Sequence, residues 1–274
     1  MIKVSLPKQG GFSLKAIIAC LLAVCLAIIW LAVAYQIDRR RSADLREIRL
    51  STEFQAQAAA ENTNSVIKRL DEILLDLRMR WDGDSRQFGK IVRLRQGYMA
   101  DVAFQIAIID QDGWLVFSNL GAPKERIYLG EREHFRVHVG GGDHLFISKP
   151  LLGKVSAKWS IQFTRPIIEA GVFQGVLVVS VSPDVFTAFH QRLGQDSTVS
   201  LVANSGDFLA RHPDGLQAMG KKLTDLPFLQ SDSPQSGSYT RVGKIDGVER
   251  IYGFYRLPEY GLTVNVGRST ERAL

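Results

Sequence analysis

Cysteine is nearly absent from this chain. Of its 274 residues only Cys20 and Cys25 are cysteines, and both lie within one apolar run near the N-terminus. The chain after this run has no thiol, which excludes a small scaffold held together by disulfide bonds. A domain without thiols is compatible with oxidising and with reducing compartments, so this absence does not identify the compartment.

Charge is absent from residues 16–35, and this stretch is strongly apolar. A helix of that length spans about 30 Å, the thickness of a hydrocarbon core. We therefore predict a transmembrane signal anchor at residues 16–36, preceded by a short tail at residues 1–15. A buried helix of a globular domain is one alternative, and a signal peptide cleaved after Ala32-Val33-Ala34 is another.

The excess of positive charge is confined to the N-terminal region. The net charge is +6, and residues 1–50 contain eight Lys or Arg but three Asp or Glu. The rest of the chain is close to neutral, so the charge does not indicate a nucleic-acid surface, and we expect no nucleic-acid partner. Five arginines follow the apolar run and three lysines precede it, which by count places the C-terminal side in the cytoplasm. Long domains translocate largely regardless of such charges, so the count leaves the orientation open.

Helix-breaking residues are absent from a long segment after the apolar run. No proline occurs between Ile37 and Pro123, and no glycine between Ile37 and Gly83. Within this segment apolar residues recur at helical spacing, at Val66, Leu70, Ile73, Leu74, Leu77 and Trp81. We predict a stalk helix ending near Arg80, a break at Asp82-Gly83-Asp84 and a second amphipathic helix over residues 88–99. Residues 37–100 then form stalk and packing helices. The apolar stripe either joins two stalks in a homodimer or covers the chain's own sheets.

Strand patterns begin at residue 102 and then repeat. Strands are predicted over residues 102–110, 114–119, 144–150, 159–167 and 175–182, with a turn at Asp112-Gly113. Pro183 with Asp184 predicts the start of a short helix after the last of these strands. Residues 197–213 have the same strand, glycine turn and strand as residues 102–119, and residues 250–274 mirror residues 159–186. A repeat of this length predicts an α+β fold with two similar antiparallel-sheet domains in series.

Three segments resemble the double Cache family, the PAS-like extracytoplasmic sensors of bacterial transmembrane receptors. They are "YLGEREHF" (128–135), "ISKPLLG" with "WSIQFTRPI" (147–167), and "GVFQGVLVVSV" (171–181). The resemblance covers about residues 36–274. It implies a membrane-distal lobe at residues 101–190 and a membrane-proximal lobe at residues 191–274. It also implies the orientation, with a cytoplasmic tail at residues 1–15 and with residues 37–274 in the periplasm, anchored in the bacterial inner membrane.

The resemblance also implies a ligand site in the membrane-distal lobe. Arg132 matches the family's pocket arginine, which clamps a carboxylate. The other candidates are His134, Phe135, Ser148, Trp159, Arg165 and Ser180. Ser180 stands where amino-acid sensors of the family carry an acidic residue, so a small carboxylate suits the site better than an amino acid. Alternatively, Arg132 is a surface ion-pair residue between two glutamates, and Trp159 belongs to the core.

The sequence indicates no cofactor, metal or catalytic site. Four histidines lack metal-ligand spacing, at His138, His144, His190 and His212. "GGDHL" (141–145) looks like the GGDEF signature of diguanylate cyclases, but a glycine-rich hairpin accounts for it better.

We therefore expect a non-enzymatic, homodimeric sensor module that binds a small molecule and signals across the membrane. The alternatives are the sensory part of a diguanylate cyclase or histidine kinase with catalytic residues beyond position 274, and a structural interaction protein.

Overall fold

The computed structural model describes residues 14–121, 125–193, 197–230 and 232–271. The chain divides into two compact units, residues 1–47 with 273–274, and residues 48–272. Nearly all of the predicted cytoplasmic tail lies outside the described residues, and the predicted domain boundaries stay predictions.

Helix α1 (Leu14–Met79) begins the described chain. In the first unit its apolar side chains are exposed, including Leu22, Trp30 and Leu31. Among the described residues it is the one helix that is long and apolar enough to cross a membrane. Continuous apolar exposure is costly in water and normal in lipid, so this segment fits the predicted anchor at residues 16–36.

In the second unit, helix α1 is followed by α2 (Ser85–Met99). The break between them falls at the predicted Asp82-Gly83-Asp84 segment. The Asp84 carboxylate accepts hydrogen bonds from the backbone N–H groups of Arg86 and Gln87, at 2.8 and 3.3 Å. This N-cap satisfies two of the free N–H groups at the start of α2 and fixes where the helix begins.

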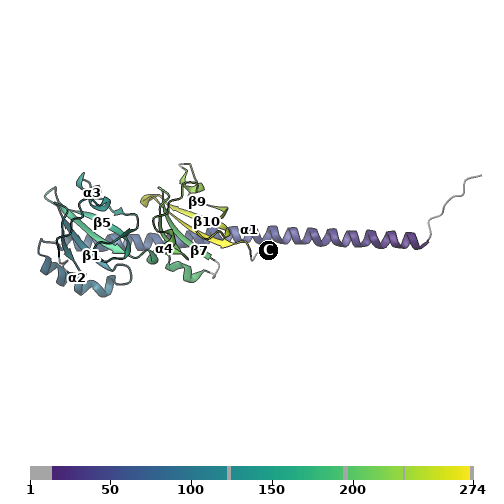
Figure 1. The fold of residues 1–274 in the computed structure, drawn as a ribbon, viewed down its shortest axis with the longest axis horizontal. Coiled ribbons are helices and arrows are strands. Elements are labelled where there is room, and N and C mark those ends of the chain that lie inside the picture. Colours follow the sequence, from purple (N-terminus) through teal and green to yellow (C-terminus); the bar gives the residue numbers. More distant parts are fainter. Residues whose placement is uncertain (1–13, 122–124, 194–196, 231, 272–274) are drawn as a thin grey trace, which may run out of the picture. The chain divides into compact units, whose positions relative to one another are not determined.

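Two antiparallel sheets follow, and both are visible in Figure 1. The first has the strand order β2-β1-β6-β5-β3, with β4 paired to β5. Its strands are β1 (Gln105–Asp110), β2 (Leu115–Ser118), β3 (Phe146–Ile147), β4 (Leu151–Leu152), β5 (Trp159–Glu169) and β6 (Val172–Val181). Helix α3 (Glu133–Val139) lies between β2 and β3 in the sequence. We call this sheet, α3 and their loops the first lobe.

The second sheet has the order β8-β7-β11-β10-β9. Its strands are β7 (Ser197–Ala203), β8 (Phe208–His212), β9 (Ser236–Val242), β10 (Glu249–Leu257) and β11 (Leu262–Ser269), accompanied by α4 (Gly215–Ala218), η3 (Pro227–Leu229) and η4 (Pro258–Tyr260). We call this part the second lobe. The two orders are the same when β1 is matched to β7 and β6 to β11, so the predicted α+β fold with tandem antiparallel sheets is confirmed.

The apolar stripe of α1 packs against the chain's own sheets. Leu70, Leu74 and Leu77 are fully buried in one core cluster with residues of both sheets. Within the second unit, Asn64 of α1 accepts a hydrogen bond from Tyr260 of the second lobe, and Asp71 pairs with Arg165 of the first. Of the two predictions for the stripe, covering the sheets is therefore correct, and the stripe gives no support to a dimer.

Three local predictions were wrong or incomplete. The segment after Pro183 forms two 3₁₀ turns, η1 (Pro183–Phe186) and η2 (Ala188–Arg192), in place of the expected helix. Strand β9 was not predicted, because its Ser-Gly-Ser start lacks a strand pattern. The segment 140–145 is an irregular loop and not a hairpin, and its Asp143 forms ion pairs with Arg78 and Arg165, at 2.7 and 2.9 Å.

Candidate ligand-binding site

A small pocket lies on the face of the first sheet that points away from α1. Alternation along the strands separates the two faces, since Ile106 and Ile108 belong to the core with α1 while Ala107 and Ile109 lie on the pocket side. The cavity has a volume of about 40 Å³. Its lining residues are Gln105, Ala107, Ile109, Leu115, Leu129, Arg132, His134, Leu151, Gly153, Lys154, Val155, Gln162, Val178 and Ser180.

The floor of this pocket carries a row of polar side chains across three strands. Gln105 of β1 is paired with Ser180 of β6, which is paired with Gln162 of β5. The Ser180 hydroxyl donates to Gln162 Oε1 at 2.6 Å, and Gln162 Nε2 donates to Ser160 Oγ at 2.8 Å. These bonds fix the orientation of the Gln162 amide, so its remaining N–H has a set direction.

Two cations form the wall of the pocket. Lys154 Nζ donates to Glu131 Oε1 at 2.6 Å and to the carbonyl oxygen of Tyr128 at 2.9 Å. Arg132 Nε lies 3.4 Å from the same glutamate oxygen, and the hydrogen bond from Lys154 lowers the pKa of Glu131 below its usual range. Of the described residues that line the pocket, none is an aspartate or glutamate. The wall therefore has one positive charge in excess, and its geometry favours an anion.

His134 adds a neutral polar group to the pocket. Its side chain is 4% exposed, and Nδ1 has no hydrogen-bond partner within the described protein. Burial, aided by the charge of Arg132, lowers the pKa of His134 to about 4. The imidazole is therefore neutral at pH 7, and His134 lines the pocket with its Nδ1 unpaired.

Of the seven predicted site residues, the structure brings together Arg132, His134 and Ser180. Phe135 does not line the pocket: it packs in the apolar layer beside it, with its ring centroid 5.8 Å from that of Phe173. Ser148 is also outside, since its hydroxyl bonds only to backbone, accepting from Gln162 N and donating to the carbonyl of Lys149.

Trp159 and Arg165 lie outside the pocket because of their positions on β5. Trp159 is the first residue of the strand and is 38% exposed, so it belongs neither to the pocket nor to the core. Arg165 is three residues from Gln162 and therefore on the opposite face of the sheet. There it donates to both carboxylate oxygens of Asp71 on α1, at 2.5 and 2.8 Å.

Three polar side chains that line the pocket were missed from the sequence, namely Gln105, Gln162 and Lys154. Both glutamines interrupt apolar strand patterns, in "VAFQIAIID" and "WSIQFTRPI". A polar side chain buried within a sheet needs a hydrogen-bond partner. These glutamines could therefore have indicated the pocket floor. Lys154 follows a glycine in a turn, and nothing local in the sequence distinguishes it.

No known protein-family profile matches this chain, and no curated protein has a significantly similar sequence. Solved structures of similar fold do exist. The extracellular domain of rpHK1S-Z16, named as a histidine kinase, is 23% identical, with a TM-score of 0.64 over 87% of this chain and 96% of that one.

Two chemoreceptor domains are similar as well. The ligand-binding domain of Pseudomonas aeruginosa PctB, in complex with L-Gln, is 16% identical over 81% of this chain and 91% of that one, with a TM-score of 0.64. That of Campylobacter jejuni Tlp3, in complex with 4-methylisoleucine, is 12% identical over 85% and 94%, with a TM-score of 0.60. This chain thus has the tandem-sheet, Cache-type fold of extracellular sensory domains.

Proposed function

We propose that this chain is a membrane-anchored periplasmic sensor module whose first-lobe pocket binds a small carboxylate. The observation that carries the proposal is the charge of the pocket, where Arg132 and Lys154 share a single carboxylate, that of Glu131. The structural neighbours PctB and Tlp3 are solved with amino acids or an amino-acid analogue. An amino acid also needs a group that accepts its ammonium, and the described lining residues include no aspartate or glutamate.

The pocket is small for such a ligand in its present form. A volume of about 40 Å³ holds roughly three water molecules. A ligand larger than a carboxylate group therefore requires the turn at residues 153–155 to move outward.

Strand β5 offers a route from the pocket to α1. Gln162 faces the ligand side, while Arg165 on the opposite face holds Asp71 of α1. Asp71 and the candidate membrane segment belong to the same helix. A shift of β5 on ligand binding would therefore act on α1, which we propose as the first step of signalling. Homodimerisation, with two such helices side by side, remains part of this proposal.

A thermal-shift screen of the full chain in detergent tests the binding proposal. The panel contains acetate, malonate, succinate and citrate, with primary amines and neutral amides of matching size. We expect stabilisation by a carboxylate that is lost in Arg132→Gln and kept in Arg136→Gln, an exposed arginine of the same helical turn. Loss of a charged hydrogen bond corresponds to an affinity decrease of about 10- to 100-fold. Stabilisation by amines alone would refute the proposal.

A further inference from the structure

The second lobe has a pocket at the positions that correspond to the first. Trp114 pairs with Tyr128 as an isolated bridge in the first lobe, and Asp207 pairs with Lys222 in the second. The next residue along each chain segment, Leu129 or Leu223, lines its pocket. In both lobes a Gly-Lys turn forms another wall, with Lys154 in the first and Lys244 in the second. The agreement between these elements indicates that the second pocket is a product of the repeat.

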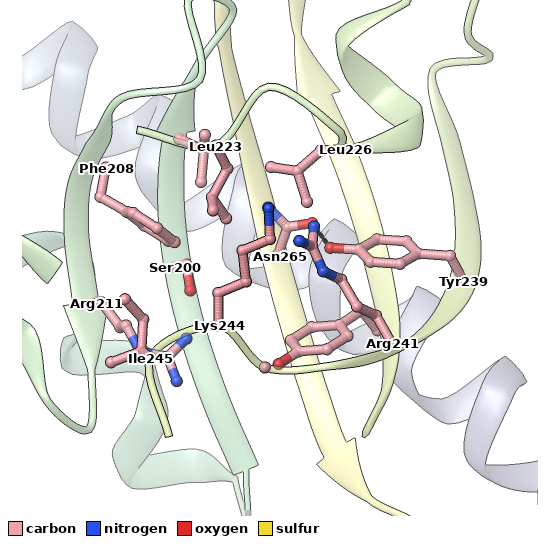
Figure 2. A pocket seen from close by; sticks show the side chains of 13 residues that line it. Ser200, Phe208, Arg211, Leu223, Leu226, Tyr239, Arg241, Lys244, Ile245 and Asn265 are labelled. Atoms are coloured by element: carbon pink, nitrogen blue, oxygen red, sulfur yellow. Dashed lines mark hydrogen bonds between the residues drawn. The ribbon is translucent and has the colours of Figure 1, made fainter. Parts of the chain in front are cut away.

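The second pocket is richer in polar groups. Its cavity is about 30 Å³, which holds roughly two water molecules. Figure 2 shows the side chains of Arg241, Lys244 and Asn265 extending toward the middle of the pocket, with Tyr239 beside them. The Tyr239 hydroxyl donates to Asn265 Oδ1 at 3.3 Å, which leaves the asparagine amide nitrogen on the cavity side as a donor.

Cations outnumber carboxylates around this pocket. Arg241 and Lys244 both donate to Asp225, at 3.0 Å. Arg211 and Arg250 both donate to Asp246, at 2.9 Å. These four cations share two carboxylates, so the group has two positive charges in excess.

Three guanidinium nitrogens in this group have no acceptor. Arg211 Nε, Arg241 Nη1 and Arg250 Nε are buried, and none has a hydrogen-bond partner within the described protein. Arg211 is 5% exposed, so water does not readily replace the missing partner. Buried donors of this kind carry a desolvation cost that an anion in the cavity would remove.

The two pockets differ in where they place the guanidinium group. Leu151 of the first pocket corresponds to Arg241 of the second, because each lies on the edge strand two residues before the Gly-Lys turn. Arg132 corresponds to Leu226, because each lies four residues after the bridge residue, Tyr128 or Lys222. The sheet also changes, since the pair Ala107–Val178 is replaced by Ser200–Asn265. The guanidinium group thus enters each pocket from a different wall, and the floor of each pocket is different.

We propose that the second-lobe pocket is a separate binding site for a small oxyanion group, a carboxylate or a phosphate. Arg211, Arg241 and Lys244 supply its charge, and Asn265 and Ser200 supply hydrogen bonds from the sheet. This site does not depend on the one in the first lobe, and the two sites have different specificities because their walls and floors differ.

Isothermal titration calorimetry on the full chain in lipid nanodiscs tests this site. The probes are inorganic phosphate, acetate and malonate, each at constant ionic strength against chloride, so that the arms distinguish phosphate from carboxylate. We expect at least one probe to bind with a Kd that rises tenfold or more in Arg241→Gln and about threefold in Lys244→Met, whose exposed charge is screened by solvent. The same Kd should be unchanged in Arg132→Gln and in Lys221→Met, an exposed lysine outside the pocket.

Lys244→Met keeps the test decisive if Arg241→Gln does not fold, because the Lys244 side chain is 52% exposed and its loss leaves the core intact. The proposal is overturned if no probe binds in a manner that depends on Lys244 or Arg241. It is also overturned if Arg132→Gln alone removes all binding, a result that would leave the first-lobe site standing. If binding of the probes depends on Arg241 and no binding depends on Arg132, only the first-lobe proposal is refuted.

Discussion

The two lobes have the same strand order but meet helix α1 in different ways. Phe163 of β5 is paired with Val179 of β6, and Gly253 of β10 is paired with Val266 of β11, so the two residues correspond. Phe163 is fully buried in the core beside α1. At Gly253 a Cβ atom would collide with the backbone of Thr52 and Glu53 on α1. In the first lobe the ring of Phe163 fills the space between the sheet and α1. In the second lobe the glycine at position 253 allows the sheet and α1 to lie in direct contact.

The pocket faces of the two lobes differ as well. Loop position matches His134 of the first lobe to Phe228 of the second, and both are buried. The first lobe thus has a titratable group where the second has a purely apolar one. One strand topology thus accommodates different side chains on both faces of the sheet. Differences at a few corresponding positions change the polar groups that each pocket offers to a ligand.

The largest effect is expected from Phe163→Ala. Removing a fully buried ring leaves a cavity between the first sheet and α1, and such changes cost about 3–5 kcal/mol. Urea unfolding of the full chain, followed by circular dichroism, measures the loss. Phe163→Leu is the matched control and should cost less than half as much, and equal losses for both would show that the ring does not fill this gap.

A pH-dependent effect of similar size is expected from His134. Its pKa of about 4 in the folded chain lies below the usual value near 6.5. On acidification the unfolded chain takes up the proton first, so the folded state loses stability as the pH falls from 6.5 toward 4. The loss for this one residue reaches roughly 3 kcal/mol at the acidic end.

His134→Phe, which copies the second lobe, should reduce this loss of stability. Unfolding midpoints of the wild type and the variant, measured from pH 7 to pH 4, give the comparison. Burial also lowers the pKa of His138 to about 4, so part of the pH dependence should remain. An identical pH dependence in both proteins would contradict the assignment of a buried neutral His134.

Gly253→Ala should destabilise the second lobe by about 1–3 kcal/mol, since the added methyl group meets helix backbone, which cannot rotate aside. Gly97→Ala in α2 is the matched control, because nothing lies within 4 Å of a Cβ at that position. It should stabilise the chain by about 0.5–1 kcal/mol through helix propensity. Urea unfolding measures the change in the free energy of unfolding for both variants. A change of the same sign in both would refute the close approach of α1 to Gly253.

The smallest effect is expected from Lys154→Met in the first pocket. Its side chain is 39% exposed, so solvent and salt screen its charge. We expect a carboxylate Kd that rises about threefold, with unfolding stability changed by less than about 0.5 kcal/mol. Titration calorimetry at low and at physiological salt measures both the effect and its screening. A larger effect than that of Arg132→Gln would reverse the assigned roles of the two cations.

The elements that were predicted from the sequence are those with a strong period. The α1 stripe at Leu70, Leu74 and Leu77 and the apolar strands around Val178 follow directly from hydrophobic spacing. Strand β9 was missed because its residues show no clear alternation of apolar and polar side chains. Its place in the sheet depends on backbone pairing with the adjacent strand β10, which leaves no hydrophobic pattern in the sequence.

The site was predictable in part. Arg132, His134 and Ser180 came from a family resemblance and line the pocket, whereas Arg165 was assigned to it without regard to strand alternation. Counting in twos from Gln162 places Arg165 on the α1 side, so this error was avoidable. The position of Lys154 was not predictable, because it depends on how a turn folds over a sheet.

Carboxylate binding in the first-lobe pocket is tested most directly by a calorimetric comparison of three ligands that share one carbon skeleton. The carboxylate that gives the largest thermal shift is titrated into the full chain in nanodiscs beside its neutral amide and its α-amino acid. We expect that the carboxylate binds to the wild type, that the amide does not, and that Arg132→Gln weakens binding of the carboxylate by about 10- to 100-fold. Carboxylate binding would be contradicted if the amide bound equally well. It would also be contradicted if only the amino acid bound and its Kd were unchanged in Arg132→Gln.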